Sequence, residues 1–163
     1  MELKRHFSLR TILVSLCFVA SMAYLVYGLM PAEASTYAVD SKLIIPSINL
    51  STDVAKLVMT NGEIPTPDTI VGSFSTHDHK TLLVGHSSTV FNNLENVKIG
   101  DEIFYRGSLY RITSYNLVEK NSIKMGKILA STNRDSLVLM TCAGEDYGDG
   151  NYSHRLIINA ILR

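Results

Sequence analysis

The stretch that decides the fold class is Ser136-Leu-Val-Leu-Met-Thr-Cys142, an apolar run of strand length that stops at a cysteine. Such a run is typical of a buried β-strand. Arg155–Leu162 is a second run of the same kind. Because side chains alternate between the faces of a strand, its even-numbered residues are predicted to face the core, with Arg155 on the opposite face. The segment 143–154 contains three glycines and is predicted to be a loop, so that Cys142 would be the last residue of its strand.

Shorter runs of similar character fill the sequence upstream, with turn residues between them. Asp101–Tyr105 and Leu109–Val118 are predicted to form a hairpin. Thr81–Gly85 is predicted to be a strand that ends just before His86. Many short strands with little helix predict an all-β domain, either a barrel or a sandwich. The other extended segments are expected at 42–45, 48–50 and 53–59, and a short helix within 121–130.

The N-terminal part has a different composition. Thr11–Met30 contains no charged residue, and about 20 apolar residues in a helix are enough to cross the hydrocarbon core of a bilayer. Three basic residues precede this segment against one acid, so the positive-inside rule predicts a cytoplasmic N-terminus and an extracellular domain. The expected organisation of this single-pass protein of the cell membrane is a cytoplasmic segment at 1–10, a transmembrane signal anchor at 11–30, a stalk at 31–41 and a folded domain at 42–163.

A cleaved signal peptide is the alternative for the same segment. Ala32-Glu33-Ala34 fits the small-x-small pattern of a cleavage site. The apolar stretch, however, is longer than the hydrophobic part of a usual signal peptide, and its length favours an uncleaved anchor. Both interpretations export the domain.

The charge balance excludes one class of partner. The 163 residues include 15 basic and 15 acidic ones, without the clustered positive charge that a nucleic-acid surface needs. No nucleic-acid partner is therefore predicted.

Cys142 is a candidate reactive thiol. The only other cysteine, Cys17, lies in the apolar N-terminal segment, so the predicted topology excludes a disulfide between them. His86 follows a predicted strand and Arg155 begins another, which places both where a site can form. A thiolate nucleophile, an imidazole that carries a proton and a guanidinium that stabilises an oxyanion are the groups that a thiol enzyme needs. Taken singly, each has a simpler interpretation: a small buried side chain, a loop histidine and a surface charge.

Four stretches follow one another along residues 42–163: Lys42-Leu-Ile-Ile-Pro-Ser-Ile-Asn-Leu50, Leu82-Leu-Val-Gly-His-Ser87, residues 94–103 and residues 136–142. They resemble stretches of the sortases, which are membrane-anchored cysteine transpeptidases of Gram-positive-type surfaces. The first resembles the opening strands of the family, and the second is similar to the segment that holds its catalytic histidine. The third resembles its Leu…Gly-Asp-x-Ile element, and the fourth, with Arg155, resembles its Leu-x-Thr-Cys…Arg signature. Thr-Cys or Gly-His alone is a weak signal, whereas the ordered set is specific.

The resemblance implies an eight-stranded β-barrel with one or two short helices and a site in a groove. It implies that Cys142 attacks the Thr–Gly bond of a C-terminal sorting signal of the Leu-Pro-x-Thr-Gly type carried by surface proteins. His86 would be the proton shuttle, and Arg155 the clamp for the oxyanion or the substrate. An amine of a peptidoglycan precursor, or a pilin lysine, would then take the substrate protein from the thioester.

The same resemblance bears on cofactors and subtype. No metal or organic cofactor is required for this chemistry, and calcium, which some sortases use, has no site here that can be aligned. Wall anchoring is favoured over pilus polymerisation, because the short stalk shows no lid with an acid–Pro–aromatic anchor.

Weaker signals lie outside the proposed triad. The acids Glu145, Asp146 and Asp149 either form a solvated loop or attract the cationic amine. His77-Asp78-His79 lacks further metal-ligating partners and is predicted to be a polar loop. His154 is expected on the face opposite to Arg155. Tyr147 and Tyr152 either line the peptide site or pack in the core or at the rim.

Two other classes of function remain open. Another exported cysteine peptidase or transpeptidase, such as an L,D-transpeptidase-like protein, would carry a His-Gly-Cys-type signature, whereas this chain has Thr-Cys-Ala-Gly. A membrane-tethered β-barrel binding module without enzymatic activity would bury Cys142 as an inert side chain.

Overall fold

The computed structural model describes residues 38–58, 64–77, 79–148 and 150–163. The cytoplasmic segment, the anchor and most of the stalk that the sequence predicts lie outside these ranges. Within the described ranges, no helix combines the length and the apolar character needed to span a bilayer.

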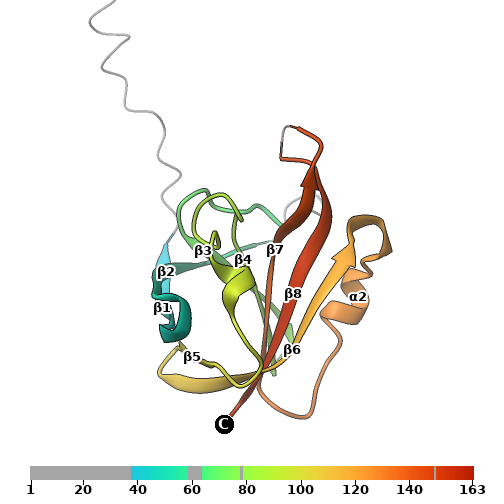
Figure 1. Ribbon diagram of the computed structural model, residues 1–163. Helices are drawn as coiled ribbons and strands as arrows, with labels where there is room; N and C mark the ends of the chain where they lie inside the picture. The colour runs from blue at the N-terminus through green and yellow to red at the C-terminus, as the bar shows by residue number, and fades with distance from the viewer. Residues whose placement is uncertain (1–37, 59–63, 78, 149) are drawn as a thin grey trace, which may run out of the picture. The chain divides into compact units, whose positions relative to one another are not determined.

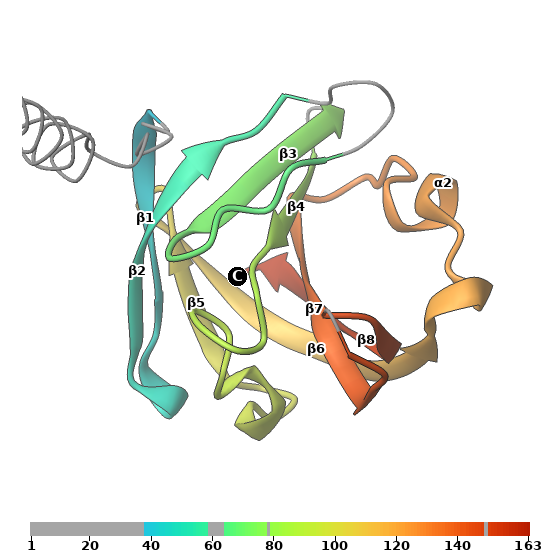
Figure 2. The ribbon, with the colours of Figure 1, turned by 90° about the horizontal axis from the view of Figure 1, so that it is seen from above.

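In this described part of the chain, eight strands close into one barrel in the order β1-β2-β3-β4-β7-β8-β6-β5 (Figure 1). Figure 2 shows the strands around a common centre, with α2 outside the ring. The predicted all-β barrel with short helices is confirmed. The strands are β1 Val39–Ile45, β2 Leu50–Lys56, β3 Val71–His77, β4 Lys80–Val84, β5 Glu102–Tyr105, β6 Ser108–Glu119, β7 Ser136–Asp146 and β8 Tyr152–Leu162, and the helices are η1 Pro46–Ile48, η2 Leu94–Asn96, η3 Lys120–Ser122 and α2 Met125–Ile128.

The barrel interior is filled by alternate residues of the strands, as the period of two requires. On β8, Leu156, Ile158 and Ala160 are buried in it, as predicted, and Leu162 is partly buried against it. Their partners come from all around the barrel and include Leu43, Ile45, Val54, Val71, Leu83, Ile103, Tyr105, Ile112, Leu137 and Leu139.

A second apolar cluster covers the outer face of β4, β7 and β8. We call it the outer cluster, and its buried members are Leu57, Leu82, Val84, Val138 and Ile157. Residues of α2 and of the segment before it pack against this cluster, and so does Met140. Because β4 and β7 are parallel and apolar on both faces, their sequences read as continuous apolar runs instead of alternating ones. This explains the composition of residues 136–142.

The predicted end of the strand at Cys142 is wrong. Cys142 does not end its strand, because β7 continues to Asp146 and pairs with β8 from Tyr152 onward. The ladder passes an irregularity between Ala143 and Asp146, where Gly144 adopts a φ of +81°, a conformation that glycine tolerates without strain. The Glu145 N–H donates to Ser153 Oγ at 2.9 Å and holds the two strands together there.

At the other end of the chain, β1 begins at Val39, within the segment predicted as stalk. The extended segment expected at 48–50 is divided, because Ile48 ends η1 and Leu50 begins β2. The predicted β5–β6 hairpin is confirmed.

Candidate active site

The candidate site lies across three neighbouring strands, with β7 between β4 and β8. On one side, β7 is parallel to β4, and the ladder ends with Val84 opposite Met140. On the other side, β7 is antiparallel to β8, with Cys142 directly opposite Arg155. Residues directly opposite each other in an antiparallel pair have Cα atoms only about 4.5–5.5 Å apart. The fold therefore places the thiol and the guanidinium side by side.

Cys142 and Arg155 share one face of the sheet, the face of the outer cluster. Cys142 is two positions from Met140 and Arg155 is two positions from Ile157, and side chains two positions apart point the same way in a strand. His86 lies two residues beyond Val84, the last residue of β4.

A groove of about 580 Å³ opens at this point, and His86, Cys142 and Arg155 all line it. The other residues along the groove come from β7, from β8, from the β7–β8 connection and from the loops before β3 and after β4: Thr66, Gly85, Ser87, Ser88, Met140, Thr141, Asp146, Gly150 and Tyr152. Cys142 is a free cysteine of intermediate burial. The structure thus brings together, in a solvent-accessible groove, the three groups that the sequence selected.

Thr141 connects β7, which carries Cys142, with the segment after β4, which carries His86. Its side chain is buried, and its Oγ1 donates a hydrogen bond to the Gly85 carbonyl at 2.7 Å. The two bonded residues are 56 positions apart in the sequence. Gly85 immediately precedes His86, and Thr141 immediately precedes Cys142. A buried bond of this kind restricts how far the two side chains can move apart.

The turn after β4 holds His86 from the other side. The Phe91 N–H donates to the His86 carbonyl at 3.0 Å, and Phe91 is buried in the barrel core. Gly85 permits this arrangement, because a Cβ there would lie only 2.6 Å from Val90 Cγ1 and 2.8 Å from Phe91 Cδ2. The histidine is therefore anchored to the core through its own backbone.

Arg155 is positioned by backbone carbonyls. Its Nη1 donates to the His154 carbonyl at 2.9 Å and to the Tyr152 carbonyl at 3.3 Å. Among the described residues both hydrogen bonds of this guanidinium involve Nη1, which leaves Nη2 and Nε as donors for a substrate oxygen.

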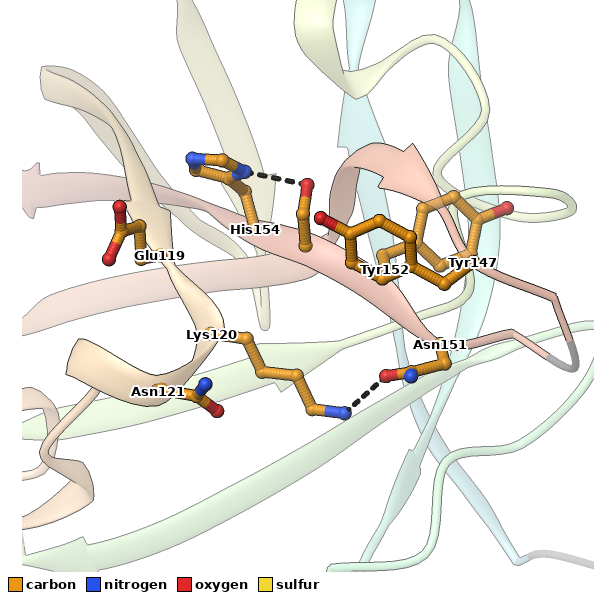
Figure 3. Close-up of a pocket in the computed structure, with 8 residues that line it drawn as sticks. Glu119, Lys120, Asn121, Tyr147, Asn151, Tyr152 and His154 are labelled. Atoms are coloured by element: carbon orange, nitrogen blue, oxygen red, sulfur yellow. Dashed lines mark hydrogen bonds between the residues drawn. The ribbon is translucent and has the colours of Figure 1, made fainter.

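A second, polar pocket of about 420 Å³ lies beside the β7–β8 connection and the end of β6 (Figure 3). His154 and Tyr147 line it and are absent from the lining of the groove that contains Cys142. The His154 Nδ1 lies 2.7 Å from Ser153 Oγ. The prediction that His154 faces away from Arg155 is consistent with this arrangement, and Tyr147 is not a groove residue.

Two of the remaining weak candidates line these pockets: Tyr152 lines both, and Asp146 lines the groove. Glu145 is exposed, while Asp149 lies outside the described residues. Of the predicted polar loop at 77–79, His77 is the last residue of β3 and Asp78 lies outside the described residues. The His79 Nδ1 lies 2.6 Å from Asp135 Oδ1. Among the described residues no three His, Cys, Asp or Glu side chains are close enough to hold a metal ion together.

The sequence did not indicate two contacts. One is the Thr141 hydrogen bond, because a threonine in an apolar strand has many possible partners. The other is Asp68, whose Oδ1 lies 3.7 Å from His86 Nε2. Pro65 and Pro67 predicted that the segment around Asp68 is extended. They did not predict that this segment lies beside the end of β4.

Comparison with known proteins agrees with the fold. The sortase domain model matches residues 43–163. A lid mutant of sortase A from Corynebacterium diphtheriae is 23% identical, with a TM-score of 0.60 over 86% of this chain and 78% of that one. Sortase A from Listeria monocytogenes is 18% identical, with a TM-score of 0.60 over 77% of this chain and 88% of that one. Sortase C-1 from Actinomyces oris is 22% identical, with a TM-score of 0.58 over 88% of this chain and 82% of that one.

The comparison with curated proteins gave no significant match. At these identities the solved structures show that the barrel is the same, and the family follows from the domain match, which covers most of the chain. The chain therefore belongs to the sortase family and is a cysteine transpeptidase of the sortase type.

Proposed function

We propose that Cys142 is the nucleophile, His86 the proton shuttle and Arg155 the oxyanion or substrate clamp in the transfer of proteins from a C-terminal sorting signal to an amine. One observation carries this proposal. Three residues from separate parts of the sequence, one just beyond the end of β4 and one each on β7 and β8, line the same groove. Membership of the sortase family supports the reaction type.

In the first half of the reaction, the Cys142 thiolate attacks the carbonyl carbon of the Thr–Gly bond in a Leu-Pro-x-Thr-Gly-type signal. The negative charge that develops on the carbonyl oxygen is stabilised by the Arg155 guanidinium. The tetrahedral intermediate collapses as the C–N bond breaks, and His86 donates its proton to the departing glycine amine. The products are a thioester on Cys142 and the free C-terminal fragment.

In the second half, an amine attacks the thioester carbonyl. His86 accepts the proton of the attacking amine, the C–S bond breaks, and the sulfur leaves as a thiolate. The substrate protein is then joined to the amine by a new amide bond, and the enzyme returns to its initial state. Amine attack instead of hydrolysis is favoured by a groove in which water access is limited.

The substrates of this reaction are surface proteins with a sorting signal, and the acceptor is an amine of a peptidoglycan precursor in preference to a pilin lysine. Asp146 supports a cationic acceptor, because its carboxylate lines the groove beside Cys142. Met140, which packs against the outer cluster, also lines the groove and offers an apolar contact to the Leu-Pro part of the signal.

We further propose that the enzyme works on the outer side of the cell membrane, held by a helix at residues 11–30 with the N-terminus in the cytoplasm. The uncharged stretch and the basic residues before it support this location.

A peptide-library cleavage assay, read by mass spectrometry with candidate amines added, tests the function. We expect cleavage between Thr and Gly, a thioacyl adduct on the enzyme and transfer to the preferred amine. Cys142→Ala should abolish cleavage and the adduct while leaving the unfolding transition unchanged, and His86→Ala should lose nearly as much. Full turnover by Cys142→Ala would refute the nucleophile assignment, and an inert Cys142 thiol in the native protein would favour a binding module.

A further inference from the structure

We propose that Asp68 is a positioning residue for His86, and that its carboxylate stabilises the protonated imidazole during both proton transfers. The inference rests on the proposed function, because it assigns a partner to the proton shuttle. The geometry behind it is a distance of 3.7 Å between Asp68 Oδ1 and His86 Nε2. A carboxylate at this distance attracts an imidazolium and has little effect on a neutral ring.

The Asp68 backbone is fixed relative to the turn that carries His86. Thr89 Oγ1 donates to the Asp68 carbonyl at 2.6 Å, and the Thr89 N–H donates to the His86 carbonyl at 3.3 Å. Thr89 therefore links the two residues through their main chains. Although the Asp68 side chain is 95% exposed, its point of attachment is held beside the histidine.

The segment before Asp68 is restrained as well. Pro67 is buried, and the two prolines at 65 and 67 each fix one backbone torsion angle. Thr66, between them, lines the groove next to His86. The segment 64–68 thus contributes Thr66 to the groove and carries the Asp68 carboxylate to the side of His86.

The charged groups around His86 define when this carboxylate matters. β7 contributes Cys142 and Asp146 to the groove, and β8 contributes Tyr152 and Arg155. In the free enzyme, a Cys142 thiolate can pair with the imidazolium. In the thioester the sulfur carries no charge, and Asp68 is then the carboxylate 3.7 Å from the ring nitrogen. The imidazolium that forms when the acceptor amine gives up its proton is therefore stabilised by Asp68.

The test compares Asp68→Asn with Asp68→Glu, and uses Glu95→Gln, an exposed acid on η2, as the matched control. Two rates are measured: alkylation of Cys142 by iodoacetamide at mildly acidic pH, and transfer of a sorting-signal peptide to an amine. We expect Asp68→Asn to lower both by roughly twofold to fivefold at low ionic strength, the range typical of exposed ion pairs. Asp68→Glu should restore most of the loss, and about 1 M salt should reduce the difference, because it shortens the screening length to about 3 Å.

Three results would overturn the proposal: rates for Asp68→Asn equal to those of Glu95→Gln, a loss that persists unchanged in high salt, or a loss accompanied by a lower unfolding midpoint. The last two would indicate a structural role. Alkylation needs no sorting signal, so the effect on Cys142 remains measurable even if the peptide is not a substrate. Absence of peptide transfer in the wild type would contradict the proposed function alone.

Discussion

Gly85→Ala adds one methyl group beside His86 and should lower both the free energy of unfolding and the rate of catalysis. Gly85 lies between the end of β4 and His86, and its carbonyl accepts the Thr141 hydrogen bond. A Cβ at this position would lie 2.6 Å from Val90 Cγ1, and 2.8 Å and 3.0 Å from two ring carbons of Phe91. Carbon atoms in contact normally stand about 3.5–4.0 Å apart, so the neighbours must move by about 1 Å.

The magnitude follows from what must move. Phe91 is 2% exposed and part of the barrel core, so its ring has no open space to enter. Inserting a methyl group into a packed core costs about 1–3 kcal/mol of unfolding free energy. Because the Phe91 N–H is hydrogen-bonded to the His86 carbonyl, a shift of this turn also displaces the histidine. A displacement of about 1 Å at a catalytic group can lower the rate by up to about 100-fold.

The assay is urea unfolding followed by far-ultraviolet circular dichroism, with peptide cleavage rates on the same preparations. Gly126→Ala is the matched control, because a Cβ at that position in α2 meets nothing within 4 Å. It should stabilise the protein by up to about 1 kcal/mol, the helix preference of alanine over glycine, with unchanged activity. The reasoning is refuted if Gly85→Ala keeps both the unfolding free energy and the cleavage rate of the wild type.

Two further predictions concern Arg155 and Tyr110. Arg155→Lys should lower the rate of acyl-enzyme formation by about tenfold or more, although the positive charge is retained. The reason is that an ammonium group cannot reproduce the planar guanidinium held by the His154 carbonyl. A stopped-flow rate equal to that of the wild type would contradict the clamp role. Burial, reinforced by the Asp135 carboxylate, raises the pKa of Tyr110 above its ordinary value of 10.0. The folded state therefore keeps this proton to higher pH than the unfolded state does, and the resulting stability is present below pH 10.0 and is lost as the pH rises above it. Tyr110→Phe should flatten the fall in unfolding free energy between about pH 9 and 11, and an equally steep fall in the variant would argue against the shift.

The strands were predictable from the sequence because short apolar runs between turn residues have few other solutions in a domain of this size. The end of β7 was not. Glycines at 144, 148 and 150 suggested a loop directly after Cys142, whereas Gly144 is the residue that lets the ladder with β8 continue past an irregularity. Local composition signals a glycine-rich segment, but it does not distinguish a bulge from a loop.

The candidate site was only partly predictable for a different reason. Cys142, His86 and Arg155 were selected by residue type and family resemblance, but their convergence depends on β4 being the parallel neighbour of β7, which no local pattern indicates. Asp68 was not predicted at all. It lies beside His86 because of tertiary hydrogen bonding through Thr89, and a single exposed aspartate carries no signal for that in the sequence.

The parallel pairing of β4 with β7 also governs when during folding the enzyme can first react. The hydrogen bond from Thr141 to Gly85 spans 56 residues, including β5, β6 and their helices, so it requires the closure of a large loop. Pairings of such long range slow the folding of a domain. A chain that is still being synthesised holds His86 long before Cys142 has a place beside it. The thiol lies beside the histidine only once β7 has paired with β4, so the proposed chemistry depends on the closed barrel.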